Sequence, residues 1–310
     1  MGSAMQPRLY VLDTGFSLPD RLGSILSCLT DGSDLRTVIA GMPHNPDGIA
    51  IDHAAGRMYW TNMGPKLDYN NGSLESANLD GSDRQIIVPQ FQVGAWTPKQ
   101  IALASQSRKL YWSDREGMKV MRCNLDGSDA EVLVSTGSTD EDRADTSRHC
   151  VGIAVDESRG CFYWSQKGPS KGGAGRIFRS PMDVAAGTKP EERPREMLLG
   201  GLPEPIDLEV EAETQTLFWT DRGDPPRGNT LNKISLADLA AASKAQTVIK
   251  SDILARRLHE AIGLSLDHKH QKAYVTDLAG GVYSIDLKTK EKTVLFPELG
   301  DLTGIAIAHL

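Results

Sequence analysis

The stretch Lys109-Leu110-Tyr111-Trp112-Ser113-Asp114 is one copy of a six-residue motif that recurs along the chain. The other five copies, each with an aromatic third residue, lie at residues 8–13, 57–62, 161–166, 216–221 and 272–277. Successive aromatic residues are 49 to 56 positions apart, slightly more than the roughly 40–50 residues of known propeller repeats. Self-similarity at this spacing predicts six copies of one structural unit.

Each motif except the first follows a short segment in which large aliphatic residues alternate with small or polar ones. This alternation is typical of a strand whose two faces differ, so we predict the innermost strands at residues 48–52, 100–104, 152–156, 207–211 and 263–267. Asp-Gly pairs at residues 31–32, 80–81 and 126–127 are strong hairpin signals. Outer strands are predicted after them or in the matching places, at residues 36–39, 85–88, 131–134, 196–199, 246–249 and 292–296.

The two ends of the repeat region complement each other. The motif at residues 8–13 has no inner strand before it, and residues 304–308 form an inner strand with no motif after it. Pairing these segments completes a sixth blade and removes an open sheet edge. The sequence therefore predicts an all-β protein, a six-bladed β-propeller of four-stranded blades in a single domain over residues 8–310. Residues 1–7 are expected to lie outside it, since Met1 to Met5 resemble an expression remnant.

The aliphatic inner strand, the Tyr-Trp-Thr/Ser-Asp strand and the Leu-Asp-Gly-Ser turns at residues 79–82 and 125–128 together resemble the YWTD propellers of the low-density-lipoprotein receptor class. The resemblance covers residues 8–309. The chain departs from the pattern at Val11 and Val275, which replace Trp, at Asn62 and Gln166, which replace Asp, and in losing the Asp-Gly turn after residue 176. Free-standing propellers similar to this one occur in fungal natural-product pathways, where some catalyse hetero-Diels–Alder cyclisations.

Composition and cysteine usage bound the remaining possibilities. The net charge of −7 is spread without a Lys/Arg block, which argues against a nucleic-acid partner. No apolar run approaches the ~20 residues of a membrane span, and the first residues lack the features of a signal peptide. The four cysteines, without a CxxC pair, are expected to be free thiols in a cytoplasmic and monomeric protein. A Cys150–Cys161 bridge remains open.

Several residues receive a structural interpretation. Trp60, Trp112, Trp164 and Trp219 lie in mid-strand and are expected to pack between blades. The motif carboxylates Asp114, Asp221 and Asp277 are expected to satisfy buried backbone donors between blades. Cys28 and Cys123 occupy equivalent positions, which suggests packing. We also predict a surface helix at residues 237–245 and an acidic solvated loop at residues 139–145.

Candidate functional residues lie three and four positions before each inner strand, where the loops should converge on the channel mouth. Convergent polar groups on a rigid rim favour a ligand site, although loop tips are also polar simply because they face water. We predict that four residues act as catalytic donors that polarise a carbonyl or quinone-methide oxygen: His44, Arg148, His149 and His259. Substrate contacts are predicted for Asn45, Trp96, Glu204, Glu260 and Asp301, with Trp96 stacking on the substrate.

Three functions are compatible with this rim. The family resemblance implies a biosynthetic cyclase that needs neither metal nor cofactor and acts on an apolar or polyphenolic small molecule by positioning it. A second hypothesis is a protein- or peptide-binding module. The third is a metal-dependent, lactonase-like hydrolase with an ion held by Asn45, His149, Glu204, Glu260 and Asp301.

Overall fold

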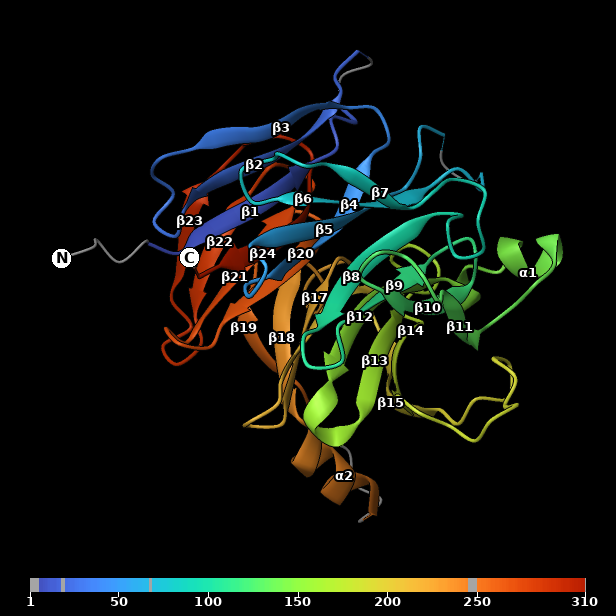
Figure 1. Cartoon of the computed structure of the whole chain (residues 1–310). Coiled ribbons are helices and arrows are strands. Elements are labelled where there is room, and N and C mark those ends of the chain that lie inside the picture. Colours follow the sequence, from blue (N-terminus) through green and yellow to red (C-terminus); the bar gives the residue numbers. More distant parts are fainter. Residues whose placement is uncertain (1–5, 18–19, 67–68, 245–249, 310) are drawn as a thin grey trace.

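Six four-stranded antiparallel sheets surround a central channel in a computed structural model of the protein (Figure 1). The structure describes residues 6–17, 20–66, 69–244 and 250–309. Successive inner strands pack against one another, and the last inner strand packs against the first, so the ring is closed. The predicted all-β, six-bladed propeller is confirmed.

Each blade has the same strand order from the channel outward. The inner strands are β4 (Pro46–Asp52), β8 (Pro98–Ala104), β12 (Cys150–Asp156), β16 (Pro205–Glu211), β20 (Ala261–Asp267) and β24 (Leu302–Ala308). The second strands are β5 (Arg57–Asn62), β9 (Lys109–Asp114), β13 (Cys161–Gln166), β17 (Thr216–Asp221), β21 (Lys272–Asp277) and β1 (Arg8–Asp13). The third strands are β6 (Ser73–Asn78), β10 (Lys119–Asn124), β14 (Gly175–Pro181), β18 (Thr230–Ser235), β22 (Val282–Asp286) and β2 (Gly23–Leu29). The outer strands are β7 (Gln85–Val88), β11 (Glu131–Ser135), β15 (Glu196–Leu202), β19 (Asp252–Ala255), β23 (Lys292–Phe296) and β3 (Arg36–Met42).

The six motif strands have the predicted bounds, whereas every inner strand begins two residues earlier than predicted. In all six inner strands the pairing register with the motif strand shifts within the first four residues, as between Pro46 and Ile49. Because the register shifts there, the first two residues of each inner strand do not follow the alternation of apolar and polar residues by which the strands were predicted. The outer strand predicted at residues 246–249 lies outside the described residues, and the fourth strand of that blade is β19 instead.

Blade packing rests on the motif. Trp60, Trp112, Trp164 and Trp219 are fully buried, as predicted, and take part in the apolar clusters between blades. The Ser or Thr before the motif's last residue joins neighbouring blades, since Thr61 Oγ1 accepts from Gly48 N–H and donates to the Lys99 carbonyl of the next blade at 2.6 Å. Ser113, Ser165, Thr220 and Thr276 also donate to a carbonyl of the next inner strand.

The closing blade has the order β24-β1-β2-β3, as the sequence predicts. Its motif carries Leu12 where the other blades have Ser or Thr, so Leu12 has no hydroxyl for the link to the next blade. Thr303, on the terminal strand β24, supplies that link instead by donating to the Pro46 carbonyl at 3.0 Å. The terminal strand therefore closes the sheet and also ties it to the following blade.

The motif carboxylates act within a blade, which corrects the prediction that they act between blades. Asp114 accepts hydrogen bonds from Thr97 N–H at 2.7 Å and Trp96 N–H at 3.1 Å, both in the loop that leads into β8 of the same sheet. Asp221 and Asp277 accept in the same way from Glu204 N–H and His259 N–H. The carboxylates therefore hold the loops at the channel mouth.

Two short helices lie outside the blades. Residues 139–145, predicted as a loop, contain α1 (Asp140–Ala144), because Thr139 and Asp142 form a capping box at its start. The predicted surface helix is α2 (Leu236–Lys244), and residue 245 lies outside the described residues. Among the described residues, no helix is long and apolar enough to cross a membrane.

The four cysteines are free thiols, and Cys28 and Cys123 are buried on equivalent third strands. Cys150 lies opposite Gln166, whereas Cys161 lies opposite Asp156 at the other end of the same hairpin. Five residues of extended strand separate the two positions by about 16 Å, far beyond the ~7 Å limit for a disulfide. A Cys150–Cys161 bridge is therefore incompatible with the fold.

Candidate functional site

The upper face of the propeller, defined here as the face on which the inner strands begin, has a layer of buried side chains at the channel's end. Each inner strand contributes its second residue: Asp47, Lys99, Val151, Ile206, Ile262 and Thr303. The three aliphatic members form one apolar cluster with Leu278. On the other side, Lys99 Nζ lies 2.6 Å from Asp47 Oδ1 and 3.0 Å from Met63 Sδ. The layer is thus half apolar and half polar, with Lys99 and Asp47 as its charged pair.

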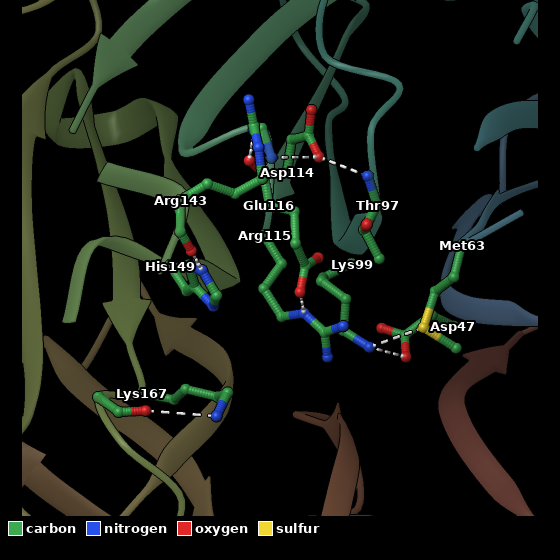
Figure 2. A network of polar contacts seen from close by, with 12 residues as sticks. Asp47, Met63, Thr97, Lys99, Asp114, Arg115, Glu116, Arg143, His149 and Lys167 are labelled. Carbon is green, nitrogen blue, oxygen red and sulfur yellow. Dashed lines mark hydrogen bonds and ion pairs between the residues drawn. The ribbon is translucent and has the colours of Figure 1, made fainter. Parts of the chain in front are cut away.

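Lys99 of this layer belongs to a group of basic side chains, which we call the mouth cluster: Lys99, Arg115, His149 and Lys167 (Figure 2). Figure 2 shows Arg115, His149 and Lys167 pointing toward a shared space, with Lys99 next to Arg115. Arg115 and Lys167 each directly follow the last residue of a motif strand, at the upper end of β9 and β13. Two neighbouring blades therefore bring these side chains together, since Lys99 and Arg115 belong to the β8–β11 blade and His149 and Lys167 to the β12–β15 blade.

Carboxylates pair with the cations of the mouth cluster. Arg115 Nε lies 2.5 Å from Glu116 Oε1, and Lys167 Nζ lies 3.3 Å from Glu204 Oε1. Glu204 is fully buried and also accepts from Arg222 at 2.6 Å and from the Lys171 backbone N–H at 3.0 Å. Although burial alone would raise the pKa of Glu204, Arg222 lowers it below its usual value. The carboxylate is therefore ionised.

Burial and like charges act together on the bases of this cluster. Burial lowers the pKa of Lys99 and of Lys167, and the nearby Arg115 charge lowers both pKa values further, against the opposing effects of Asp47 and Glu204. Burial also lowers the pKa of His149, with smaller contributions from Arg115 and Lys167. His149 is consequently neutral at pH 7 and can offer one lone pair to a ligand.

The hydrogen bond of His149 fixes which nitrogen carries the proton. His149 Nε2 lies 2.9 Å from the Arg143 carbonyl oxygen, which can only accept, so Nε2 is protonated. Nδ1 is then an acceptor, and no described residue donates to it. The mouth cluster therefore combines cationic donors with one imidazole acceptor.

Trp96 lies against Arg143 of α1, the residue whose carbonyl oxygen accepts from His149. The Arg143 guanidinium carbon lies 3.5 Å from the Trp96 ring centroid, a cation–π contact, and the Trp96 backbone is held by Asp114. One face of the indole is thus covered by Arg143 in this structure. The predicted stacking of a substrate on Trp96 stays a prediction, and on that face it requires Arg143 to move.

The structure brings only some of the predicted site residues together. His149 belongs to the mouth cluster, and Glu204 pairs with its Lys167. Glu260 lies outside the mouth cluster: its Oε2 is 3.8 Å from Arg222 Nε, and its Oε1 is 3.5 Å from Lys171 Nζ. The proposed roles of these residues remain untested predictions.

Four other predicted residues lie elsewhere on the upper face. Asn45 has a left-handed backbone (φ 53°) and donates through Nδ2 to the Gly64 carbonyl, while the His44 carbonyl accepts from Gly64 N–H. Asp301 accepts from the Ser17 backbone N–H at 2.7 Å. The side chain of His259 is largely exposed, with 70% of its area accessible. Loop geometry accounts for the first three contacts.

Arg148 faces away from the channel. It lines a separate cavity of about 300 Å³ and lies 3.3 Å from carboxylate oxygens of both Asp142 and Asp145. A residue three or four positions before a predicted inner strand therefore does not always point toward the channel.

Sequence reasoning missed Lys99, Arg115 and Lys167, although a signal was present. The residue directly after each motif is Thr14, Met63, Arg115, Lys167, Arg222 or Leu278, so three successive blades carry a cation there. Because the inner strands begin two residues early, the channel end is formed by their second residues, which we expected to lie in a loop. Aligning the motif ends instead would have identified Arg115 and Lys167.

A metal site is not formed by the predicted ligand set. Glu204, Glu260 and Asp301 are engaged by Arg222, Lys171 and Ser17 as described. Among the residues that the structure describes, no three His, Cys, Asp or Glu side chains come together in an arrangement that could hold a metal ion. The lactonase-like alternative therefore lacks a ligand set in this fold.

Below the upper layer, the channel contains a cavity of about 250 Å³ that extends toward the lower face, where His53 and His268 line it. Most of its wall is aliphatic, but Asp207 and Glu209 of β16 also contribute. Four of the chain's seven histidines follow inner strands on this lower face, namely His53, His268, His270 and His309. Histidine is thus not concentrated on the upper rim.

Glu209 provides a test of the channel's polarity. Burial raises its pKa from 4.5 to about 7, so the native state binds this proton more tightly than the unfolded chain. Stability should then fall as the pH rises from 4.5 to about 7. We expect Glu209→Gln to increase the free energy of unfolding by about 1–3 kcal/mol at pH 8 and by less than about 1 kcal/mol at pH 5. Urea unfolding at both pH values measures this difference.

The exposed Glu213→Gln serves as the control for this comparison, because it removes the same charge outside the channel. A Glu209→Gln effect of equal size at pH 5 and pH 8 would contradict a raised pKa.

The closed six-blade ring, the motif strands and the links between blades define a propeller of the YWTD type. The chain belongs to this low-density-lipoprotein receptor-related family: it is 55% identical to a protein of Pyricularia oryzae named low-density lipoprotein receptor-related protein 1, over 99% of this chain and 100% of the relative. It is also 40% identical, over 98% of its length, to the 3-hydroxyacyl-CoA dehydrogenase-like protein LAM1 of Cochliobolus heterostrophus, and it spans 65% of that relative. No family model matches the chain.

Solved structures agree on the architecture. A chain in the crystal structure of a nidogen/laminin complex superposes with a TM-score of 0.73 over 97% of this chain and 98% of that chain. The two sequences are 21% identical, so the similarity concerns the fold alone.

Proposed function

We propose that this protein binds a small phenolic or enolic molecule at the mouth cluster and promotes its cofactor-free cyclisation, of the hetero-Diels–Alder type, by holding and polarising one oxygen. No feature described for the mouth cluster specifically favours the alternative, a protein- or peptide-binding module. The family relationship to two fungal proteins is consistent with a role in fungal small-molecule biosynthesis.

The observation that carries the proposal is the state of Arg115. Glu116 fixes its Nε, but the two terminal NH2 groups make no hydrogen bond to any described residue, although the side chain is only 19% exposed. Lys167 Nζ contacts the Gly168 carbonyl and Glu204, which leaves one of its three donors available. Half-buried cationic donors without acceptors favour an anionic or strongly accepting ligand atom.

The neutral His149 narrows the ligand chemistry. An oxygen that accepts from Arg115 and Lys167 and donates to His149 Nδ1 must carry a proton, which describes a phenol or an enol. Charge that develops on this oxygen during a cyclisation is stabilised by the two cations. A pericyclic step needs no nucleophile or metal if the reacting parts are held in a near-attack geometry.

Tropolone and its methyl ether, which lacks the hydroxyl proton, test the binding site by calorimetric titration. We expect tropolone to bind at least about 10-fold more tightly than the ether. Arg115→Ala should weaken tropolone binding by about 10- to 100-fold, because hydrogen bonds from a charged donor contribute about 1.5–3 kcal/mol. His149→Ala should remove the preference for tropolone over the ether.

Arg159→Ala, a surface arginine near the lower end of β12, is the matched control and should leave both affinities unchanged. Equal binding of tropolone and its ether, together with unchanged binding by Arg115→Ala, would contradict the proposed site. The cyclisation is tested separately, by mixing a tropolonic quinone-methide precursor with an alkene and measuring the yield and enantiomeric excess of the adduct. An adduct that stays racemic and forms no faster with the protein would contradict the catalytic part alone.

A further inference from the structure

A second cavity, of about 300 Å³, lies in the blade formed by β12, β13, β14 and β15 and is separate from the channel. Three arginines from different segments line it: Arg148 at the end of a 3-10 turn, Arg176 on β14, and Arg195 directly before β15. Of the described residues that line this cavity, Asp145 alone is acidic. The cavity is therefore strongly cationic.

The charge of this cavity is only partly balanced within the protein. Arg148 lies 3.3 Å from oxygens of both Asp142 and Asp145. Arg176 donates to the neutral Ser147 carbonyl at 2.6 Å, and neither Arg176 nor Arg195 has a carboxylate partner among the described residues. Two guanidinium groups thus remain without counter-ions in one cavity, an arrangement that favours a bound oxyanion.

A departure from the repeat explains why this blade has the excess charge. Its motif ends in Gln166, which is 4% exposed and lines the cavity, whereas Asp114, Asp221 and Asp277 place a carboxylate at the same position. Those carboxylates accept hydrogen bonds from the backbone before the inner strand. Here the chain supplies a neutral amide instead, so the internal negative charge of the four blades that end their motif in Asp is missing where the arginines gather.

Aromatic side chains form another part of the wall. Trp164 and Phe178 stack with ring centroids 5.2 Å apart and an interplanar angle of 16°, and the Arg176 guanidinium carbon lies 5.5 Å from the Phe178 ring centroid. A cavity of this volume is larger than an inorganic phosphate ion. Its lining suits an anionic group attached to a planar or apolar body.

We propose that Arg148, Arg176 and Arg195 form a binding site for a phosphate group, carried by a small phosphate ester or by free phosphate. The guanidinium forks match the oxygen geometry of phosphate, and its two negative charges balance the two unpaired arginines. The site does not depend on the function proposed for the mouth cluster, because no residue of that cluster lines the cavity.

The experiment is a calorimetric titration of the intact protein with sodium phosphate, phenyl phosphate, sodium sulfate and sodium chloride at equal ionic strength. We expect saturable binding of phosphate, at least about 10-fold tighter than sulfate, and none of chloride. Phenyl phosphate binding more tightly than phosphate would identify an ester as the ligand, and equal affinities would identify free phosphate. If sulfate or chloride bound as tightly as phosphate, the proposal would be overturned.

Two variants locate the site. Arg195→Ala removes an exposed side chain and should weaken phosphate binding at least about 10-fold without loss of structure. Gln166→Asp restores the motif carboxylate and should abolish binding, since an internal charge then occupies the place of the ligand. Arg159→Ala should bind phosphate as the unaltered protein does. If Arg195→Ala and Gln166→Asp both bind with unchanged affinity, the cavity is not the site.

Discussion

Gly152→Ala is expected to lower the free energy of unfolding by about 3–5 kcal/mol. A Cβ at this position on β12 would lie 2.1 Å from the Ile206 carbonyl oxygen and 2.9 Å from Ser165 Oγ. These two atoms form the hydrogen bond that joins one blade to the next. The added methyl group can therefore be accommodated only by separating two inner strands. Urea unfolding followed by circular dichroism measures the loss.

Gly200→Ala is the matched control, because its Cβ would meet only the flexible Met197 side chain at 3.5 Å or more. It should change stability by less than about 1 kcal/mol. If both alanine variants were equally stable, the close approach of the inner strands would not be a determinant of the ring.

Asp114→Ala is expected to lower the free energy of unfolding by about 3–5 kcal/mol, because it leaves two buried backbone N–H groups and one part-buried one without their acceptor. The carboxylate accepts from Thr97 at 2.7 Å, Trp96 at 3.1 Å and Gly117 at 3.3 Å. Asp114→Asn keeps one acceptor oxygen and should lose about half as much. Thermal and urea unfolding rank the variants.

For Asp114, the control is Asp183→Ala, whose side chain is 94% exposed and which should be close to neutral. The same substitution also tests the link between fold and site, since Asp114 holds Trp96 and directly precedes Arg115. We expect Asp114→Ala to weaken tropolone binding as well as stability. An Asp114→Ala protein as stable as the Asp183→Ala protein would show that these hydrogen bonds are dispensable.

The motif strands were predictable because each of their residues has a separate physical role. Tyr111 and Trp112 fill the spaces between blades, Ser113 links to the next inner strand, and Asp114 holds the loop above the blade. The same residue types perform these roles in most of the blades, so six copies of the pattern suffice to place the strands. The inner strands were less well placed because their first residues lie across a register shift, where alternation fails.

The candidate site was less predictable, because its properties arise between blades. Nothing in the local sequence around Lys99 shows that it is buried against Asp47, which is 52 residues away, or that Arg115 lies beside Lys167. His149 was identified, but Arg148, the neighbouring residue, faces a different cavity. Likewise, the sequence shows Gln166 only as a departure from the Asp of the repeat. The structure shows that it lines a cavity together with three arginines.

The strand directions of the closing blade decide where the polypeptide enters and leaves the ring. Arg8 at the start of β1 pairs with Ala308 at the end of β24, while Asp13 pairs with Leu302 near the upper face. The closing blade therefore begins at Arg8 and ends at Ala308 on the lower face, whereas Arg115 directly follows the upper end of β9. A tether, a fluorophore or a solid support joined to the chain before Arg8 or after Ala308 would thus be attached on the face opposite the mouth cluster.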